Sequence, residues 1–280
     1  KGQPIAPREP VLIIKDRTVR LPDSAERMHA VNRVSLEVFP KEILCVVGES
    51  GSGKSVTAHS VMGLLPEDQL KTEAGSISVL GEPIVGASPK RLRQLRGNRM
   101  AMIFQEPMTS LNPVLSIGRQ LREPLELHLG MTKQQSLKRS SELLELVGIP
   151  DPATRLKTFP HQTSGGQRQR IMIAMALSCE PKLLIADEAT TALDVTIQAQ
   201  ILEIIKELTD RLGTSVIIIT HNLGVVARYA DSVNVMYAGK LRESGSLDQV
   251  YKESKHPYTV GLLNSVPTLD LDADVRLQPK

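Results

Sequence analysis

The stretch ILCVVGESGSGKSVTAHSVM at residues 43–62 decides the fold of this 280-residue chain. It opens with a short apolar run that is typical of a buried strand, and it closes with the apolar spacing of a helix. Between them, residues 48–55 match the pattern GxxxxGK[ST]. A glycine-rich turn from a strand into a helix directs backbone N–H groups and the helix N-terminus toward phosphate groups. The context therefore predicts a nucleotide phosphate site.

Two side chains of this turn carry its chemistry. We expect the Lys54 ammonium to supply positive charge to the β- and γ-phosphates, and the Ser55 hydroxyl to face Mg²⁺. An accidental glycine-rich turn is the alternative, and the flanking strand and helix disfavour it. The residues expected to contact the nucleotide are Gly48, Glu49, Ser50, Gly51, Ser52, Gly53, Lys54, Ser55, Val56 and Thr57.

A second apolar strand, LLIAD at residues 183–187, leads into two adjacent acids, Asp187 and Glu188. Ligands of open parallel sheets bind outside the carboxyl ends of the strands. We expect Asp187 to hold Mg²⁺, directly or through water, and Glu188 to act as base or positioner for the water that attacks the γ-phosphate. An acid pair that merely caps a helix is the alternative, which the phosphate loop on the same sheet weakens.

A third motif, Ser164-Gly165-Gly166-Gln167, precedes a predicted helix at about residues 166–178. Free N–H groups at a helix N-terminus offer a second anion site. Taken alone, the tetrapeptide is better interpreted as a helix cap. Two phosphate sites in one chain also require an explanation.

Elsewhere the chain alternates between predicted strands and helices, which implies a parallel sheet with covered faces. Between residues 105 and 162 the pattern changes to a mostly helical insert that begins with several prolines. Residues 11–14, 30–39 and 75–85 are expected to form further strands. Three more strands are predicted, at residues 100–104, 215–220 and 232–237. Helices are predicted at residues 55–65, 88–100, 137–147, 196–212 and 223–229.

Composition excludes several classes of protein. The chain is 41% apolar and 23% charged, with a net charge of +3, as in an ordinary globular protein. No run approaches the roughly 18 apolar residues of a membrane-spanning helix. The basic clusters lack interleaved aromatic residues, which disfavours nucleic acid as a partner. Cys45 and Cys179 have no CxxC spacing, and we interpret them as buried free thiols.

Taken together, the motifs resemble those of the ATP-binding cassette (ABC) ATPases, over residues from about 11 to 266. Five motifs follow the order of that family. They are the phosphate loop, Gln105 after a strand, the turn at Ser164–Gln167, the acid pair, and His221 after the strand at 216–220.

The resemblance implies an α/β fold with three parts. These are a RecA-like P-loop NTPase core with a parallel sheet, an antiparallel β subdomain and an inserted helical subdomain. The implied ATPase domain spans residues 11–266, its helical subdomain residues 106–178, and a C-terminal tail residues 267–280.

In this family the glycine turn of one subunit, called the signature, closes on the γ-phosphate held by the other subunit. ATP thus joins a head-to-tail dimer, which would explain the second anion site. By position, Gln105 would contact Mg²⁺ and the attacking water, Asp194 would cross the dimer interface, and His221 would contact the γ-phosphate. The resemblance thereby implies Glu188, His221 and Gln105 as catalytic residues, and Ser55, Gln105 and Asp187 as metal ligands.

Two further runs, FQEPMTSLNP at 104–113 and HPYT at 256–259, resemble the dipeptide, oligopeptide and nickel importer branch. This branch implies ATP and Mg²⁺ as cofactors and a peripheral place on the cytoplasmic face of the plasma membrane. It also implies a second ATPase subunit, expected to be a different chain, two membrane permease subunits and an extracytoplasmic solute-binding protein. The sequence leaves the solute open.

Two alternatives belong to other functional classes. The first is a soluble ABC-type ATPase that acts on nucleic acid or ribosomes. Such proteins tend to carry a coiled-coil insertion or a second cassette, and the sequence has neither. The second is a non-hydrolysing nucleotide switch, which the presence of Lys54, Asp187, Glu188 and His221 disfavours.

The chain departs from the family at the adenine. Relatives usually place an aromatic side chain against the base, yet residues 19–30 contain no Phe, Tyr or Trp. Leu21, Met28 or His29 must take its place. Base stacking on an aromatic contributes about 1–3 kcal/mol. We therefore expect weaker ATP binding or poorer discrimination between ATP and GTP.

Overall fold

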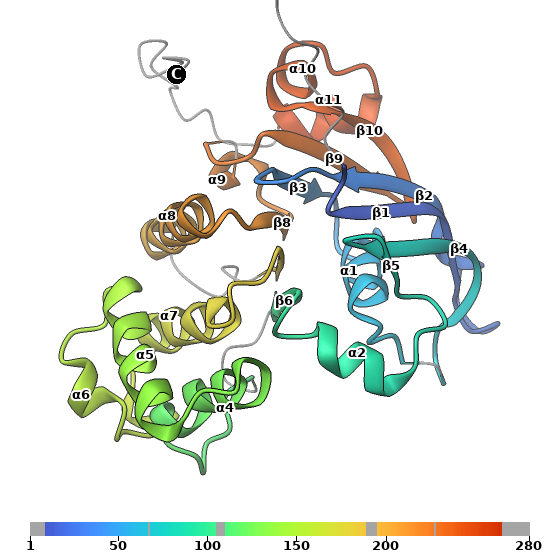
Figure 1. Ribbon diagram of the computed structural model, residues 1–280. Helices are drawn as coiled ribbons and strands as arrows, with labels where there is room; N and C mark the ends of the chain where they lie inside the picture. Colours follow the sequence, from blue (N-terminus) through green and yellow to red (C-terminus); the bar gives the residue numbers. More distant parts are fainter. Residues whose placement is uncertain (1–8, 67, 105–109, 189–194, 227, 265–280) are drawn as a thin grey trace, which may run out of the picture.

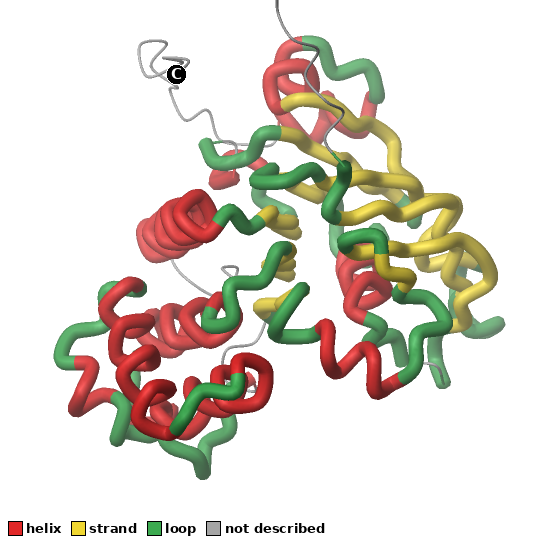
Figure 2. The backbone as a smooth tube through the Cα atoms, in the orientation of Figure 1, coloured by secondary structure: helices red, strands yellow, loops and turns green. Residues whose placement is uncertain are grey.

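The computed structural model describes residues 9–66, 68–104, 110–188, 195–226 and 228–264 of the chain (Figure 1). A central six-stranded sheet lies between a second, four-stranded sheet and a lobe of helices (Figure 2). The expected α/β class, with parallel and antiparallel sheets and a helical insert, is confirmed.

The central sheet has the strand order β10-β9-β3-β8-β7-β6, in which β10 alone runs antiparallel to its neighbour. Alternate residues of β3 pack into two different cores, one on each face of the sheet. A strand buried on both faces must be apolar throughout, which explains the uninterrupted run ILCVV. The strands are β3 (Ile43–Val47), β6 (Met100–Ile103), β7 (Leu183–Asp187), β8 (Ser215–Thr220), β9 (Ser232–Tyr237) and β10 (Lys240–Ser246).

Helices cover both faces of this sheet. Helix α1 (Lys54–Met62) packs on one face, and α7 (Gly165–Leu177) and α8 (Val195–Leu212) pack on the other. Cys45 and Cys179 are both free and buried, as expected.

The second sheet is antiparallel throughout, with the order β2-β1-β4-β5. Its strands are β1 (Leu12–Arg20), β2 (His29–Val38), β4 (Lys71–Val79) and β5 (Glu82–Pro83). Its apolar face shares a core with α1 and with one face of the central sheet. The short loop between β1 and β2 is thereby held next to the start of α1.

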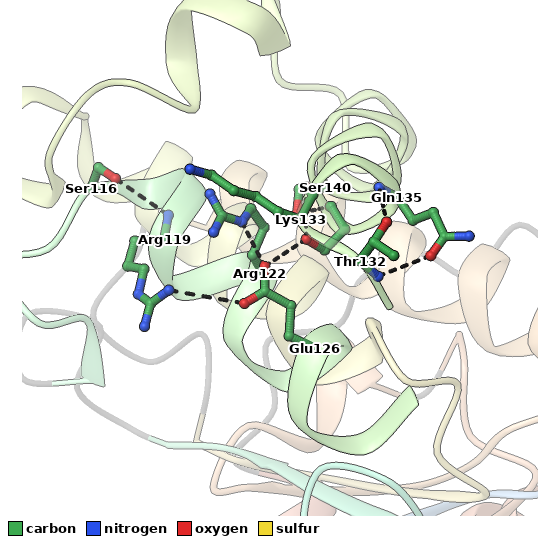
Figure 3. A network of polar contacts seen from close by, with 9 residues as sticks. Ser116, Arg119, Arg122, Glu126, Thr132, Lys133, Gln135 and Ser140 are labelled. Carbon is green, nitrogen blue, oxygen red and sulfur yellow. Dashed lines mark hydrogen bonds and ion pairs between the residues drawn. The ribbon is translucent and has the colours of Figure 1, made fainter. Parts of the chain in front are cut away.

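The helical lobe begins with α4 (Ile117–Leu129) and α5 (Lys133–Leu146), and continues through α6 (Pro152–Arg155) and a 3₁₀ turn (Pro160–Gln162) into α7. Glu126 on α4 ties the first two helices together. Its carboxylate accepts hydrogen bonds from Arg122 Nε (2.9 Å) and from Ser136 Oγ of α5 (2.8 Å), in the network that Figure 3 shows. These contacts lower the pKa of Glu126, with the Ser136 hydroxyl as the leading cause.

Helix α2 (Pro89–Leu95) is shorter than the predicted helix at residues 88–100. Arg96 leaves the helical conformation, and its guanidinium donates to the carbonyl oxygens of Met62 (2.9 Å) and Gly63 (2.7 Å) at the end of α1. A tertiary contact therefore ends α2 earlier than the local pattern suggests.

The C-terminal region adds α9 (Leu223–Val226), α10 (Leu247–Lys252) and α11 (Pro257–Asn264). Figure 1 shows α10 and α11 beside the β9–β10 end of the central sheet. In the described ranges, no helix combines the length and apolar character needed to cross a membrane.

Candidate nucleotide-binding site

At two positions of the phosphate loop, backbone atoms of neighbouring strands come too close for any residue other than glycine. Gly48 and Gly53 have φ angles of 153° and 101°. A Cβ on Gly48 would lie 2.2 Å from the carbonyl oxygen of Met236, and one on Gly53 would lie 2.5 Å from that of Ala30. The turn is thus held against β9 on one side and β2 on the other, at distances that no other residue permits.

Lys54 begins α1, and only 4% of its surface is exposed. Its ammonium donates to the carbonyl oxygens of Gly48 (2.7 Å) and Glu49 (2.8 Å). Burial lowers the pKa of Lys54, while the carboxylates of Glu188 and Asp187 oppose that shift. A buried ammonium held by carbonyl dipoles is suited to receive an anion.

Ser55 and Asp187 join the phosphate loop to the acid pair. The Ser55 hydroxyl donates to Asp187 Oδ1 over 2.9 Å, and Asp187 is 5% exposed. Burial raises the pKa of Asp187, partly offset by this hydrogen bond. Hydroxyl and carboxylate oxygens are the ligands that Mg²⁺ prefers, and Mg²⁺ is usually bound by one or two carboxylates together with substrate phosphates. The two residues fit such an ion.

A metal ion can also be held by protein ligands alone, without phosphate groups. The described segments contain no group of three or more His, Cys, Asp or Glu residues that could hold a metal ion.

Glu188 leaves β7 in a left-handed conformation, with a φ of 44°. Its N–H donates to the carbonyl oxygen of Ile219 on β8 over 2.9 Å, which holds the residue at the edge of the sheet. His221 follows β8, and its Nδ1 lies 3.8 Å from Glu188 Oε1. The carboxyl ends of β3, β7 and β8 thus bring together the phosphate loop, the acid pair and His221.

The remaining residues of the phosphate loop are placed by α1. The Thr57 hydroxyl donates to the carbonyl oxygen of Gly53 over 2.9 Å, and Val56 packs against the core beneath the second sheet. Ser52 is buried, and Ser50 and Gly51 are exposed at the tip of the turn.

The Ser164–Gln167 turn begins α7, in the helical lobe. Ser164 Oγ accepts the N–H of Gln167, and Gln167 Oε1 accepts the N–H of Ser164, each over 3.2 Å. This capping box confirms the helix-cap interpretation. A Cβ on Gly165 would meet no atom within 4 Å, and one on Gly166 would meet only Ile197 at 3.9 Å. Packing against the described residues therefore demands neither glycine.

Gln105 and Asp194 lie outside the residues that the structure describes, and their expected roles stay predictions.

The structure distinguishes the three residues that could cover the adenine in place of an aromatic side chain, which are Leu21, Met28 and His29. The ring of His29 is engaged with Glu73, with 2.8 Å between Nε2 and Oε2. Met28 is 63% exposed, and its neighbour Arg27 donates to the carbonyl oxygen of Gly51 in the phosphate loop. Met28 is therefore the best placed of the three to cover a base.

Among the residues of this site that sequence reasoning missed, Tyr258 comes from the most distant part of the sequence. Tyr258, in the HPYT run, accepts the N–H of Glu49 over 2.9 Å. The two residues are 209 positions apart, so no local pattern could have connected them. The run itself was the only available signal.

Comparisons with known proteins agree with this geometry. A family model described as "ABC transporter" matches residues 31–191. The chain is 52% identical to a dipeptide transport ATP-binding protein, DppD, of Bacillus subtilis, over 94% of this chain and 79% of that protein. It is 49% identical to the oligopeptide transport ATP-binding protein OppD of the same organism, over 95% of this chain and 75% of that protein.

Solved structures with the same fold include an ATP-binding cassette, MJ0796, described as a dimer in a post-hydrolysis state bound to ADP and phosphate. It has a TM-score of 0.73 and 25% identity, and the match covers 84% of this chain and 98% of that chain. CbiO1 of Clostridium perfringens, part of an ABC transporter complex, also has a TM-score of 0.73. It is 26% identical, and the match covers 88% of this chain and 92% of that chain. A family model that covers more than half of the chain, and relatives half identical over nearly all of it, establish that this chain belongs to the ABC transporter family.

Proposed function

We propose that the chain hydrolyses ATP and thereby powers an importer of peptides or of a related small solute. The solute crosses the membrane through separate subunits. The observation that carries the ATPase part is the 2.9 Å hydrogen bond between Ser55 and Asp187, which joins the phosphate loop to the acid pair. The importer part is supported by the names of relatives at about 50% identity, which are dipeptide and oligopeptide transport ATP-binding proteins.

In this proposal each residue of the site has a defined role, and Gln105 has two, because it would contact both Mg²⁺ and the attacking water. Lys54 binds the β- and γ-phosphates and balances their charge, which is the main requirement of phosphoryl transfer. Glu188 orients the attacking water and accepts its proton. His221, 3.8 Å from Glu188, contacts the γ-phosphate. Ser55, Asp187 and Gln105 would hold Mg²⁺, which would neutralise charge on the phosphate oxygens.

The same proposal gives the Ser164–Gln167 turn a partner. Helix α7 presents free N–H groups beside Gly165, where a Cβ would meet no atom of the described residues within 4 Å. A phosphate held by a second ATPase subunit would fill that space, with Asp194 at the interface. The dimeric form of the MJ0796 cassette supports this arrangement. The branch resemblance favours a different chain as the second subunit.

The proposed partners also include two permease subunits and an extracytoplasmic solute-binding protein, with the chain peripheral on the cytoplasmic face of the membrane. The helical lobe and the segment before it expose large apolar side chains, among them Val114 (76% exposed) and Leu127 (74%). Contiguous apolar patches are typical of surfaces that bind other proteins, whereas single exposed apolar side chains are ordinary. The preference for membrane subunits over nucleic acid or ribosomes rests on the relatives, which are named as dipeptide and oligopeptide transport ATP-binding proteins.

The decisive test is ATP hydrolysis by the purified chain with Mg²⁺, together with light scattering in the presence of ATP. We expect ATP to bind and to promote dimers. Binding without hydrolysis would point to an obligate second subunit, whereas a chain that did not bind ATP would contradict the proposal. Peptide uptake by vesicles with the permease subunits then tests the importer part.

We expect Gly165→Ala to lower hydrolysis without harming the fold. Alanine favours a helix over glycine by up to about 1 kcal/mol, so the thermal midpoint should stay the same or rise. The new methyl group would occupy the space expected for the partner's phosphate, and the ATPase rate should fall. Gly261→Ala, at an equally open helical position, is the matched control. Equal rates for the two variants would argue against a composite site at Gly165.

Placing an aromatic ring over the base should strengthen ATP binding. We expect Met28→Tyr to lower the Kd for ATP by about five- to 150-fold, which corresponds to about 1–3 kcal/mol of stacking. Leu21→Tyr is the control, because Leu21 is less exposed and donates its N–H to the Met28 carbonyl oxygen on the opposite side of the loop. Calorimetric titration with ATP and GTP measures both affinities. Unchanged affinity in Met28→Tyr would mean that this position does not cover the base.

A further inference from the structure

The C-terminal helix α11 is rigidly attached to the ATPase core. The carboxylate of Glu243 on β10 accepts the N–H groups of Lys255 (2.8 Å) and His256 (3.3 Å), just before the helix starts. Thr259 on the helix is fully buried, and Leu262 and Leu263 pack against the main core. The side chains of α11 therefore occupy fixed positions relative to the central sheet.

Tyr258 extends from this helix to the phosphate loop. Its hydroxyl oxygen accepts the N–H of Glu49 over 2.9 Å. Its ring packs against that of Tyr237 at the end of β9, with 4.5 Å between the ring centroids. Tyr237 follows Met236, whose carbonyl oxygen packs against Gly48. The tyrosine pair thus lies along the first turn of the loop.

A single peptide group connects Tyr258 to Lys54. The N–H of Glu49 and the carbonyl oxygen of Gly48 belong to the same planar peptide group and point in opposite directions. The N–H of this group donates a hydrogen bond to the Tyr258 hydroxyl oxygen. Its carbonyl oxygen accepts a hydrogen bond from the Lys54 ammonium over 2.7 Å. Because Gly48 lacks a Cβ, this peptide could rotate more freely than most unless both of its polar groups were held.

We propose that Tyr258 is a positioning residue for ATP binding, which fixes the Gly48–Glu49 peptide and, through it, the ammonium of Lys54. The inference rests on the proposed ATPase function and assigns part of it to a helix far away in the sequence. Burial raises the pKa of the Tyr258 phenol, so the group keeps its proton at neutral pH. A neutral hydroxyl oxygen can accept the N–H and still has one donor to offer.

The test compares two Tyr→Phe variants of the full chain. Tyr258→Phe keeps the ring against Tyr237 and removes only the hydroxyl that holds the loop. Tyr229→Phe is the matched control, because it removes a hydroxyl that donates to a backbone oxygen, that of Ala199 at 3.4 Å, in another part of the molecule. Calorimetric titration with ATP in the presence of Mg²⁺ gives the Kd, and thermal unfolding without nucleotide reports the fold.

We expect the Kd of Tyr258→Phe for ATP to rise by roughly two- to tenfold, as for the loss of one hydrogen bond to a loop that must keep its shape. The nucleotide-free thermal midpoint should match that of Tyr229→Phe. In steady-state hydrolysis the KM should rise more than kcat falls, because the hydroxyl acts on binding and not on the attacking water.

Two results would overturn the inference while leaving the ATPase function in place. The first is equal ATP affinity in Tyr258→Phe, Tyr229→Phe and the unaltered chain. The second is a loss of thermal stability in Tyr258→Phe with an unchanged KM, which would show a purely structural contact. If the unaltered chain failed to bind ATP, the proposed function itself would be wrong, and the inference with it.

Discussion

Glu188→Gln should nearly abolish ATP hydrolysis while leaving ATP binding intact. Glutamine keeps the size of the side chain but cannot accept a proton from water, and general-base catalysis contributes about 10²–10⁴-fold to a rate. The backbone position should not change, because it is set by the hydrogen bond from the Glu188 N–H to Ile219. The loss of a negative charge near the γ-phosphate should also favour the ATP-bound dimer.

The measurement is phosphate release by the variant and the unaltered chain, with light scattering in the presence of ATP. Glu37→Gln, on the exposed side of β2, is the matched control and should keep the rate of the unaltered chain. A rate for Glu188→Gln within a few-fold of that control would show that another group activates the water. His221, 3.8 Å away, would then be the next residue to test.

Lys54→Ala should lose ATP binding itself. The ammonium is buried, and its hydrogen bonds go to the carbonyl oxygens of Gly48 and Glu49. Removing one partner of a buried, hydrogen-bonded charge pair costs about 2–5 kcal/mol, which corresponds to a rise in Kd of about 30-fold to several thousand-fold. Hydrolysis should disappear with binding, in contrast to Glu188→Gln.

Calorimetric titration with ATP distinguishes these two outcomes, and Lys90→Ala on the exposed side of α2 controls for the loss of one positive charge. Thermal unfolding of Lys54→Ala without nucleotide tests whether the fold is retained. Near-normal ATP affinity in this variant would mean that the loop binds phosphate through its N–H groups alone, and that Lys54 serves only to order it.

Much of the architecture could be predicted from the sequence because its signals are local. The apolar run at 43–47 is a strand buried on both faces, and the glycines at 48 and 53 take conformations and close approaches that other residues cannot. The end of α2 could not be predicted, because Arg96 leaves the helix to bind carbonyl oxygens at the end of α1. Strand β10 and helices α10 and α11 also lacked a clear periodic pattern.

The sequence by itself determined the phosphate loop, the acid pair and the order of the motifs, because each is a short run whose chemistry depends on neighbours along the chain. The tertiary structure set His29 apart from Leu21 and Met28 as a candidate to cover a base, since Glu73 engages its ring from another strand. It also decided that Tyr258 reaches Glu49 across 209 positions. Contacts of this kind depend on how packed elements converge in space, and no local pattern encodes that convergence.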